Sequence, residues 1–325
     1  MLYVCLTFEG GLTQVSYSHY DAYRHCALCP RKCGIDRTAF ALGACKMTSE
    51  LTAARAALHY WEEPCISGER GSGAVFFSGC SLGCVFCQNH EISSEGVGFS
   101  VTDSALSDIF LRLQDVDGAN NINLVTAAHF VPHVVSALER AKAHGLKIPI
   151  VYNSSGYESV ETLKMLDGLI DVYLPDMKYF SSELSHKYSR ARDYFDAASS
   201  ALDEMFRQVG EPRFAEKDCA TEEGIMLKGM IVRHLILPGC TCDSKKIIKY
   251  LFDRYDHGIF MSIMNQYTPV TGVELPPELT RCVTDSEYDD VVDYACALGV
   301  ENGFIQEGGT VAESFIPIFN GEGII

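Results

Sequence analysis

Apolar residues recur along this chain in two alternating patterns, which together predict a series of strands and helices. Short apolar runs, rich in β-branched and aromatic residues, are typical of buried strands. Between them lie stretches whose apolar residues recur every three or four positions, as on one face of a helix. The predicted strands are 75–77, 122–126, 148–153, 170–174, 230–237 and 259–264, and the predicted helices cover 106–113, 134–141, 160–166, 181–209 and 247–255.

Six strands in series, alternating with helices, indicate parallel strands joined by right-handed crossovers. We therefore predict an α/β fold, a partial (β/α)6 TIM-like barrel, over residues 71–270. A cysteine-rich N-terminal extension (1–70) precedes it, and a C-terminal extension (271–325) is expected to cover the barrel. Residues 51–61 fit either a helix or an extended connector, and the adjacent Glu62 and Glu63 are expected to be solvated or to cap a helix.

Polar residues follow the predicted strands where their carboxyl ends would meet. In parallel barrels the site is built at that end, so these residues are candidates for binding and catalysis. His234 alternates to the opposite face of its strand and is expected to pack against a helix. The candidates are Thr126, Asn153, Ser155, Asp176, Lys178 and Arg233.

Composition narrows the classes of partner. The chain has 43 acidic and 26 basic residues, a net charge of −17, which argues against nucleic acid as partner. It has neither an apolar run long enough to span a membrane nor the features of a signal peptide. Fourteen cysteines, seven of them in two clusters, point to metal binding in a reducing cytoplasm and not to disulfides.

The first cluster, Cys80, Cys84 and Cys87, has the spacing C-x3-C-x2-C directly after the strand 75–77. A cubane iron–sulfur cluster is usually held by four cysteines, so a loop that offers three leaves one iron open to a small molecule. The alternative is a zinc loop in which His90 supplies the fourth ligand.

The second cluster, Cys26, Cys29, Cys33 and Cys45, has the spacing C-x2-C-x3-C-x11-C. Four thiolates would fully ligate either zinc or an auxiliary iron–sulfur cluster, and the sequence leaves both open.

The cysteine loop resembles the signature of the radical S-adenosylmethionine (SAM) superfamily. Further motifs resemble the group labelled pyruvate formate-lyase activating enzyme within it, from about Cys26 to Pro317. They are Cys26-x2-Cys29-Pro30-Arg31-x-Cys33-Gly34, Cys87-Gln88-Asn89, Tyr152-Asn153-x-Ser155-Gly156-Tyr157, Tyr173-Leu174-Pro175-Asp176-x-Lys178-Tyr179, Val232-Arg233-His234-Leu235, Leu237-Pro238-Gly239 and Met264-x-Gln266-Tyr267.

The resemblance implies a [4Fe-4S] cluster on Cys80, Cys84 and Cys87 whose open iron binds SAM, with Phe86 packed near the adenine. Lys178 is then expected to pair with the SAM carboxylate and Asp176 to bind a ribose or amino group, the alternative being a structural ion pair.

Arg233 suits a carboxylate of SAM or substrate, and Asn153 and Ser155 suit ribose hydroxyls. Many radical SAM proteins have Gly-Gly-Glu where this chain has Val125-Thr126-Ala127-Ala128-His129. Thr126 is therefore the first candidate for the SAM amino group.

The expected function is that of an oxygen-sensitive, cytoplasmic radical SAM enzyme, supplied by a single-electron donor such as flavodoxin or ferredoxin. The reduced cluster cleaves SAM to a 5′-deoxyadenosyl radical that abstracts hydrogen from a substrate, and the first hypothesis is a backbone glycine of a glycyl-radical enzyme. The alternatives are radical modification of a small molecule or short peptide, and a non-catalytic iron–sulfur scaffold that binds SAM.

Overall fold

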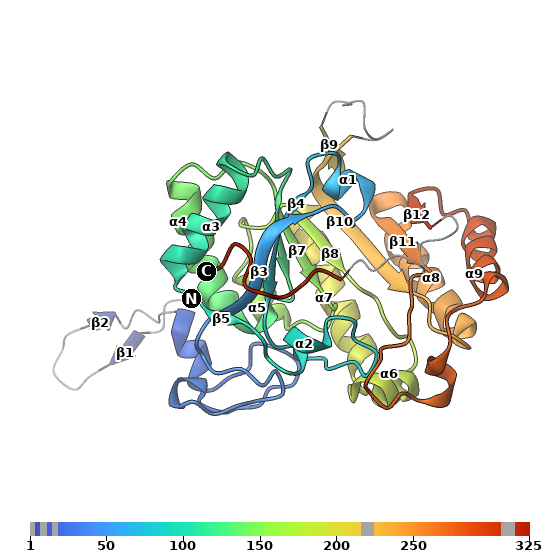
Figure 1. Cartoon of the computed structure of the whole chain (residues 1–325), viewed down its shortest axis with the longest axis horizontal. Helices are drawn as coiled ribbons and strands as arrows, with labels where there is room; N and C mark the ends of the chain where they lie inside the picture. Colours follow the sequence, from blue (N-terminus) through green and yellow to red (C-terminus); the bar gives the residue numbers. More distant parts are fainter. Residues whose placement is uncertain (1–3, 7–11, 15–18, 216–223, 307–315) are drawn as a thin grey trace.

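The structure, a computed structural model, describes residues 4–6, 12–14, 19–215, 224–306 and 316–325. Its centre is a curved ten-stranded sheet whose parallel strands include the six that the sequence predicted (Figure 1). This confirms the predicted partial barrel. The six strands, in spatial order, are β4 (Ser72–Phe77), β6 (Ile122–Val125), β7 (Ile150–Ser154), β8 (Val172–Pro175), β10 (Met226–Leu235) and β11 (Phe260–Met264).

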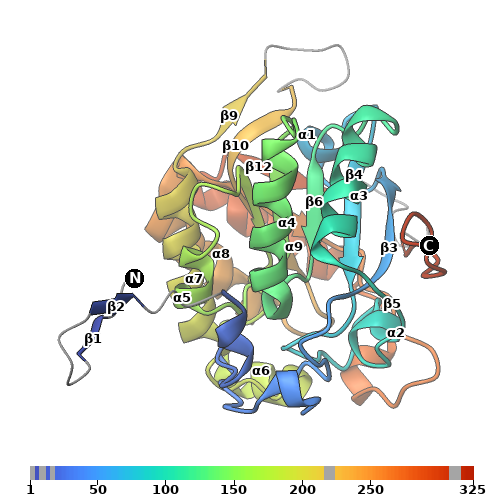
Figure 2. The same cartoon turned by 90° about the vertical axis from the view of Figure 1, so that its left-hand side faces the viewer.

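Helices between the strands cover the outer face of the sheet, as Figure 2 shows for α3 and α4. The predicted apolar face of α3 is buried, including Leu106, Phe110 and Leu113. One predicted helix, 181–209, is instead two, because Arg190 adopts a left-handed conformation that ends the first. The outer helices are α3 (Asp103–Asp115), α4 (Val131–Ala143), α5 (Val160–Lys164), α6 (Ser182–Ser189), α7 (Tyr194–Val209) and α8 (Thr241–Tyr255).

Both edges of the parallel region are extended by further strands. Before it, β3 (Thr52–His59) pairs antiparallel with β4, which settles the segment left open between helix and connector. Beyond β11, α9 (Asp285–Leu298) leads to β12 (Gly303–Ile305), a parallel strand that the sequence did not predict. The predicted C-terminal extension therefore adds a strand to the sheet.

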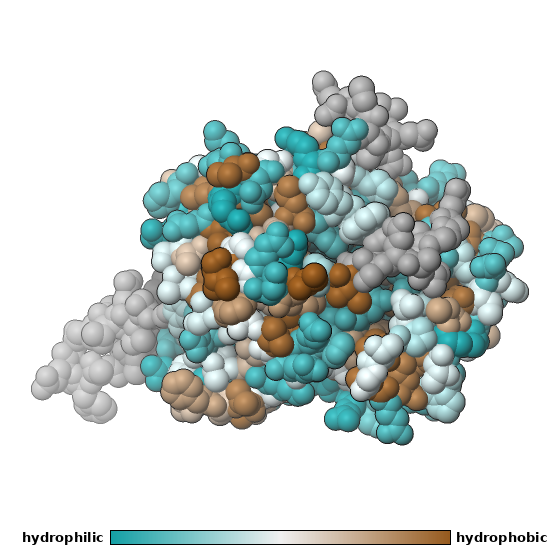
Figure 3. Space-filling view, viewed as in Figure 1, coloured by the Kyte–Doolittle hydropathy of each residue, from teal (hydrophilic) through white to brown (hydrophobic). Residues whose placement is uncertain are grey.

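The C-terminal segment passes across β3, as Figure 1 shows. The Ala56 amide donates to the Glu322 carbonyl at 2.8 Å, and the Gly321 amide donates to the Ala54 carbonyl at 3.1 Å. Figure 3 shows apolar side chains among polar ones on this face. Trp61, Ile316 and Ile318 are exposed apolar residues of these segments.

The four-cysteine segment packs against the carboxyl end of β4. Gly79, just before Cys80, has φ +84°, and a Cβ there would lie 2.7 Å from the Cys45 carbonyl oxygen. Only glycine fits such a close approach at positive φ.

Within the described residues, no helix is both long and apolar enough to cross a membrane.

The remaining short elements lie at the periphery. They are β1 (Val4–Leu6), β2 (Leu12–Gln14), β5 (Phe99–Ser100), β9 (Arg213–Phe214), α1 (Pro64–Ser67), α2 (His90–Ser93) and the 3-10 turns His19–Tyr23, Arg37–Ala39, Ala128–Phe130, Asp256–Gly258 and Pro277–Thr280.

Candidate active site

A cavity of about 240 Å³ opens at the carboxyl ends of the six parallel strands. The barrel topology brings Cys80 and Arg233, which lie 153 positions apart in the chain, to the same cavity. All ten residues predicted for the catalytic cluster and SAM line this one cavity: Cys80, Cys84, Phe86, Cys87, Thr126, Asn153, Ser155, Asp176, Lys178 and Arg233.

The three cysteines of the loop after β4 lie close enough to influence one another's protonation. Burial raises the pKa of the Cys80 thiol to about 12, and the neighbouring Cys87 and Cys84 add to the shift. Burial also raises the pKa of Cys87, an effect that Lys178 partly opposes. With their pKa values raised, Cys80 and Cys87 stay protonated unless a metal or cluster takes the place of the proton.

Two serine hydroxyls donate hydrogen bonds to these sulfur atoms. Ser189 Oγ, at the end of α6, lies 3.0 Å from Cys84 Sγ, and Ser93 Oγ, in α2, lies 3.3 Å from Cys87 Sγ. Such bonds favour the thiolate form, which is the form that ligates iron. Nothing in the sequence marked either serine, because both come from helices outside the motif.

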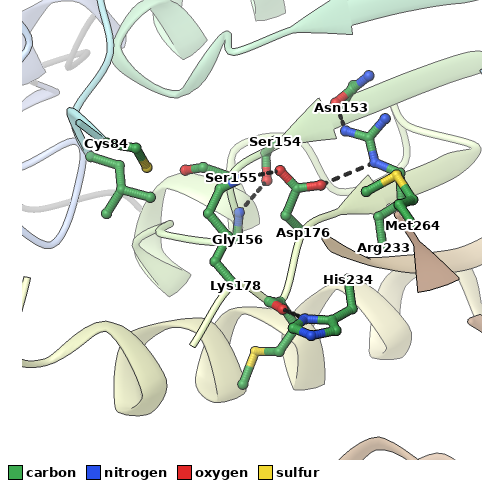
Figure 4. A network of polar contacts seen from close by, with 12 residues as sticks. Cys84, Asn153, Ser154, Ser155, Gly156, Asp176, Lys178, Arg233, His234 and Met264 are labelled. Atoms are coloured by element: carbon green, nitrogen blue, oxygen red, sulfur yellow. Dashed lines mark hydrogen bonds and ion pairs between the residues drawn. The ribbon is translucent and has the colours of Figure 1, made fainter. Parts of the chain in front are cut away.

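A network of buried charges forms the opposite wall, and Figure 4 shows Cys84 on one side of Asp176 and Arg233 on the other. Lys178 Nζ lies 2.6 Å from Asp176 Oδ2, and Arg233 Nε lies 3.0 Å from Asp176 Oδ1. A parallel β-bridge between Asp176 and Arg233 sets this geometry.

The two cations decide the charge of Asp176. Burial alone would raise its pKa, but Lys178 and Arg233 outweigh burial and hold the pKa below the usual value. Burial likewise lowers the pKa of Lys178, and Asp176 more than reverses that. All three groups are therefore charged at neutral pH.

Arg233 contacts a protein group through each of its three nitrogens, which uses three of its five N–H donors. Besides Asp176, it donates from Nη1 to Glu62 Oε2 at 3.0 Å and from Nη2 to Asn153 Oδ1 at 2.6 Å. Asn153 in turn donates to Glu62 Oε1 at 3.1 Å. Arg233 and Asn153 thus bind each other and Glu62, and their predicted roles toward a carboxylate and a ribose stay predictions.

The expectation for the two glutamates was wrong. The Glu62 side chain is only 7% exposed because it reaches into the barrel to Arg233. Glu63 is buried too, makes no capping bond with its side chain, and has a pKa raised by burial. The sequence around Glu62 and Glu63 gave no sign of this. The two residues follow β3, and only the folded chain places the end of β3 beside the barrel.

Thr126 stands at the end of β6 with φ +61° and is half-buried in the cavity wall. A β-branched residue rarely adopts this left-handed conformation, and such strain concentrates at functional sites. The Thr126 amide is held by the Asn153 carbonyl at 2.9 Å, which fixes the strained turn. His129, three residues on, is buried with Nε2 2.7 Å from the Ser78 carbonyl oxygen.

Aromatic rings form the remaining wall. Phe86 is buried and meets Tyr188 and Tyr267 edge to face, with ring centroids 6.4 and 6.0 Å away. Ser155 lines the same cavity beyond β7. His234 points away from it, as strand alternation predicted: its Nε2 lies 2.8 Å from Ser244 Oγ of α8.

The four N-terminal cysteines form a separate group and are not among the residues that line the cavity. Cys29 is buried, which raises its pKa to about 12, and Cys45 and Cys26 contribute to the shift. Burial also raises the pKa of Cys45, and the neighbouring Cys26 and Cys33 add to that shift. Cys33 Sγ accepts from the Ala44 amide at 3.4 Å. Among the described residues, no three His, Cys, Asp or Glu side chains gather tightly enough for a single metal ion, whereas each thiolate of a cubane binds its own iron.

Comparison with known proteins finds similarity in the barrel region and over most of the chain. Residues 74–209, from β4 to the end of α7, match the Radical SAM superfamily. The uncharacterized protein MJ0674 of Methanocaldococcus jannaschii is 27% identical over 281 residues, which cover 85% of this chain and 75% of that protein.

Two solved structures are similar at lower sequence identity. SuiB of Streptococcus suis, bound to S-adenosylmethionine, aligns with a TM-score of 0.48 and 13% identity over 70% of this chain and 48% of its own. This chain thus spans about half the length of SuiB. A domain of a pyruvate-formate lyase-activating enzyme from Bacteroides vulgatus aligns with a TM-score of 0.36 and 10% identity, over 55% of this chain and 91% of that domain.

Proposed function

We propose, starting from the radical SAM domain of residues 74–209, that the protein is a radical SAM enzyme whose catalytic cluster is held by Cys80, Cys84 and Cys87. The observation that carries the proposal is the meeting of these three thiols with the Lys178–Asp176 pair across one cavity. The residues fit the cofactors: three half-buried thiols leave one iron of a cubane open, and a charged lysine faces them.

Cys80, Cys84 and Cys87 would hold the cluster, which when bound would supply the one electron needed for reductive cleavage of SAM and subsequent hydrogen abstraction. A single-electron donor such as flavodoxin or ferredoxin would restore the cluster. The chain itself holds the cofactors in place and excludes water.

Lys178 and Thr126 would orient SAM at its amino acid end. Lys178 has three N–H donors, and one of them meets Asp176 Oδ2, so the ammonium can also bind the SAM carboxylate. Thr126, strained at the cavity wall, would receive the amino group. At the other end of SAM, Ser155 would bind a ribose hydroxyl and Phe86 would pack near the adenine.

Arg233 and Asn153 would act on SAM indirectly. Arg233 fixes Asp176 from behind, and Asp176 fixes Lys178, so the guanidinium sets where the ammonium points. Glu62 completes this chain of contacts by neutralising Arg233. This role replaces direct contact with SAM or substrate.

The substrate we propose is a backbone glycine of a partner protein, as in the activation of glycyl-radical enzymes. Support comes from the activase-like residues: Asp176 and Lys178 at the end of β8, and Leu237-Pro238-Gly239 after β10. Incubation with a candidate partner should give a glycyl radical signal in electron paramagnetic resonance. Active SAM cleavage without that signal would favour a small molecule or short peptide as substrate.

We also propose that Cys26, Cys29, Cys33 and Cys45 bind a second metal centre, with an auxiliary cluster favoured over zinc because no three described side chains gather tightly enough for a single ion. The mutual influence of their thiols on protonation and the amide bond to Cys33 support it. Iron and zinc should be quantified in a Cys29→Ala, Cys33→Ala variant. Loss of about four irons identifies a cluster, loss of zinc identifies a zinc site, and unchanged metal content contradicts the proposal.

The test of the proposed function is anaerobic. The protein is reconstituted with iron and sulfide, reduced with dithionite and given SAM, and 5′-deoxyadenosine is quantified by chromatography. We expect deoxyadenosine from the wild type and none from Cys84→Ala. Cys242→Ala, an exposed cysteine of α8, is the matched control and should behave as the wild type. A wild type that binds SAM on an intact cluster without cleaving it would favour a non-catalytic scaffold.

A further inference from the structure

Arg31 lies between two cysteines of the N-terminal group, yet its side chain reaches the loop that carries the catalytic cysteines. Its guanidinium donates to four backbone carbonyls. Two belong to Ser81 and Leu82, at 3.0 Å each, and two belong to Ser189 and Arg190, at 2.8 and 2.6 Å. The guanidinium also lies over the Tyr157 ring, 5.2 Å from its centroid.

Both pairs of carbonyls belong to segments that hold Cys84. Ser81 and Leu82 lie in the loop between Cys80 and Cys84, and Ser189 is the residue whose hydroxyl donates to Cys84 Sγ at 3.0 Å. A backbone bond already joins the two segments, since the Val85 amide donates to the Tyr188 carbonyl at 2.9 Å. Arg31 bridges the same two segments a second time.

The chemistry of the contact requires arginine. The last carbonyls of α6 have no partner within the helix, and they form its negative end. A planar guanidinium with five N–H donors can satisfy carbonyls of two segments at once. A lysine ammonium has three donors at one point and cannot span them.

We propose that Arg31 is a positioning residue for the catalytic cluster. It clamps the Ser81–Leu82 turn to the end of α6, which keeps the Ser189 hydroxyl on the Cys84 sulfur. Hydrogen bonds to cluster sulfurs stabilise the more negative, reduced state and so raise the reduction potential. The N-terminal four-cysteine segment thereby sets the potential of a cluster that it does not ligate.

The inference rests on the proposed function, in which Cys84 is a ligand of the catalytic cluster. A second consequence follows from the position of Arg31 between Cys29 and Cys33. A metal bound to those thiols would hold the Arg31 backbone in place, so loss of that metal should disturb the catalytic cluster in the same way.

The experiment measures the reduction potential of the cluster whose electron paramagnetic resonance signal changes when SAM is added. Anaerobic redox titrations compare wild type with Arg31→Gln, Arg31→Lys, Ser189→Ala and the double variant Arg31→Gln, Ser189→Ala. Arg24→Gln is the matched control, because Arg24 lies in the same segment and pairs with its near neighbour Asp21. Cys29→Ser tests the metal of the N-terminal group.

We expect lower potentials for both Arg31 variants and for Ser189→Ala. The double variant should be no lower than the lower of its two parents, because both act on one hydrogen bond. Cys29→Ser should shift in the same direction, and Arg24→Gln should match the wild type. Should Arg31→Gln lose iron from the loop, the same comparison is made with Arg31→Lys.

An Arg31 variant that retains the wild-type potential overturns the inference, and fully additive shifts in the double variant overturn the route through Ser189. These outcomes differ from failure of the proposed function. If the wild type itself gives no signal that responds to SAM, the proposed function fails before Arg31 is tested.

Discussion

Arg233 Nε lies 3.0 Å from Asp176 Oδ1, on the side of that carboxylate away from Lys178. One carboxylate thus holds two cations with different surroundings. Arg233 is enclosed by Glu62 and Asn153, whereas Lys178 is close enough to Cys84 for that thiol to raise its pKa. In the proposed function, Arg233 is the structural cation and Lys178 is the cation that binds SAM.

We predict that Arg233→Met strongly destabilises the fold. It leaves the carboxylates of Asp176 and Glu62 buried without their shared partner, and breaking a buried ion pair in this way costs about 3–5 kcal/mol. Urea unfolding measures the free energy. Arg254→Met, which removes an exposed arginine paired with Asp203, should cost far less. Equal losses in the two variants would show that the Arg233 network contributes little to stability.

Lys178→Met should act on SAM binding more than on stability. Asp176 keeps its ion pair with Arg233, so its carboxylate is not left buried without a cation. The lost ammonium contact should raise the Kd for SAM at least about tenfold, equivalent to roughly 1.4 kcal/mol. Calorimetry on the reconstituted protein measures it, with the exposed Lys249→Met as control. An unchanged Kd would assign Lys178 to a structural ion pair.

Gly156→Ala should displace Asp176. Gly156 has φ +75°, and an added Cβ would lie 2.2 Å from the Asp176 carbonyl oxygen. Gly168 has nearly the same φ, +79°, but its Cβ would meet nothing within 4 Å. Gly168→Ala should therefore cost only the backbone strain, about 1–2 kcal/mol.

The clash in Gly156→Ala should add about 1–3 kcal/mol to that strain and weaken SAM binding. Thermal unfolding and SAM titration of the two variants separate the two effects. Similar behaviour of both variants would show that the close approach to Asp176 does not matter.

Stability should depend on pH through Glu158. This carboxyl is buried, which raises its pKa from the ordinary 4.5 to about 8, although hydrogen bonds from Ser154 and Tyr152 oppose the shift. Between these values the folded chain holds a proton that the unfolded chain has lost. The stabilisation is thus complete below pH 4.5 and is lost as pH rises through 8, by about 1.4 kcal/mol per pH unit in between.

Glu158→Gln should remove that dependence, since an amide resembles the neutral carboxyl and does not titrate. Unfolding free energies of wild type and variant, measured from pH 5 to 9, give the comparison. Parallel curves would mean that Glu158 does not hold its proton in the fold.

The local pattern of the sequence was enough to predict the order of the elements and the polar residues at the strand ends of the cavity. Alternation of apolar runs predicted the six parallel strands, and residues at their ends meet because parallel strands share one carboxyl edge. For the same reason all ten predicted residues, from Cys80 to Arg233, line one cavity. The alternation also placed His234 correctly on the outer face.

Only the tertiary structure decided which groups those residues bind. Arg233 suited a ligand carboxylate as well as a protein one, and the approach of β3 placed Glu62 against it. Ser189 and Arg31 carry no local sign of contact with Cys84 or its loop, because the partners lie 105 and 50 or more positions away. Periodicity reports which face of an element is buried, but the partner of a buried charge depends on contacts between distant segments, which form only when the chain folds.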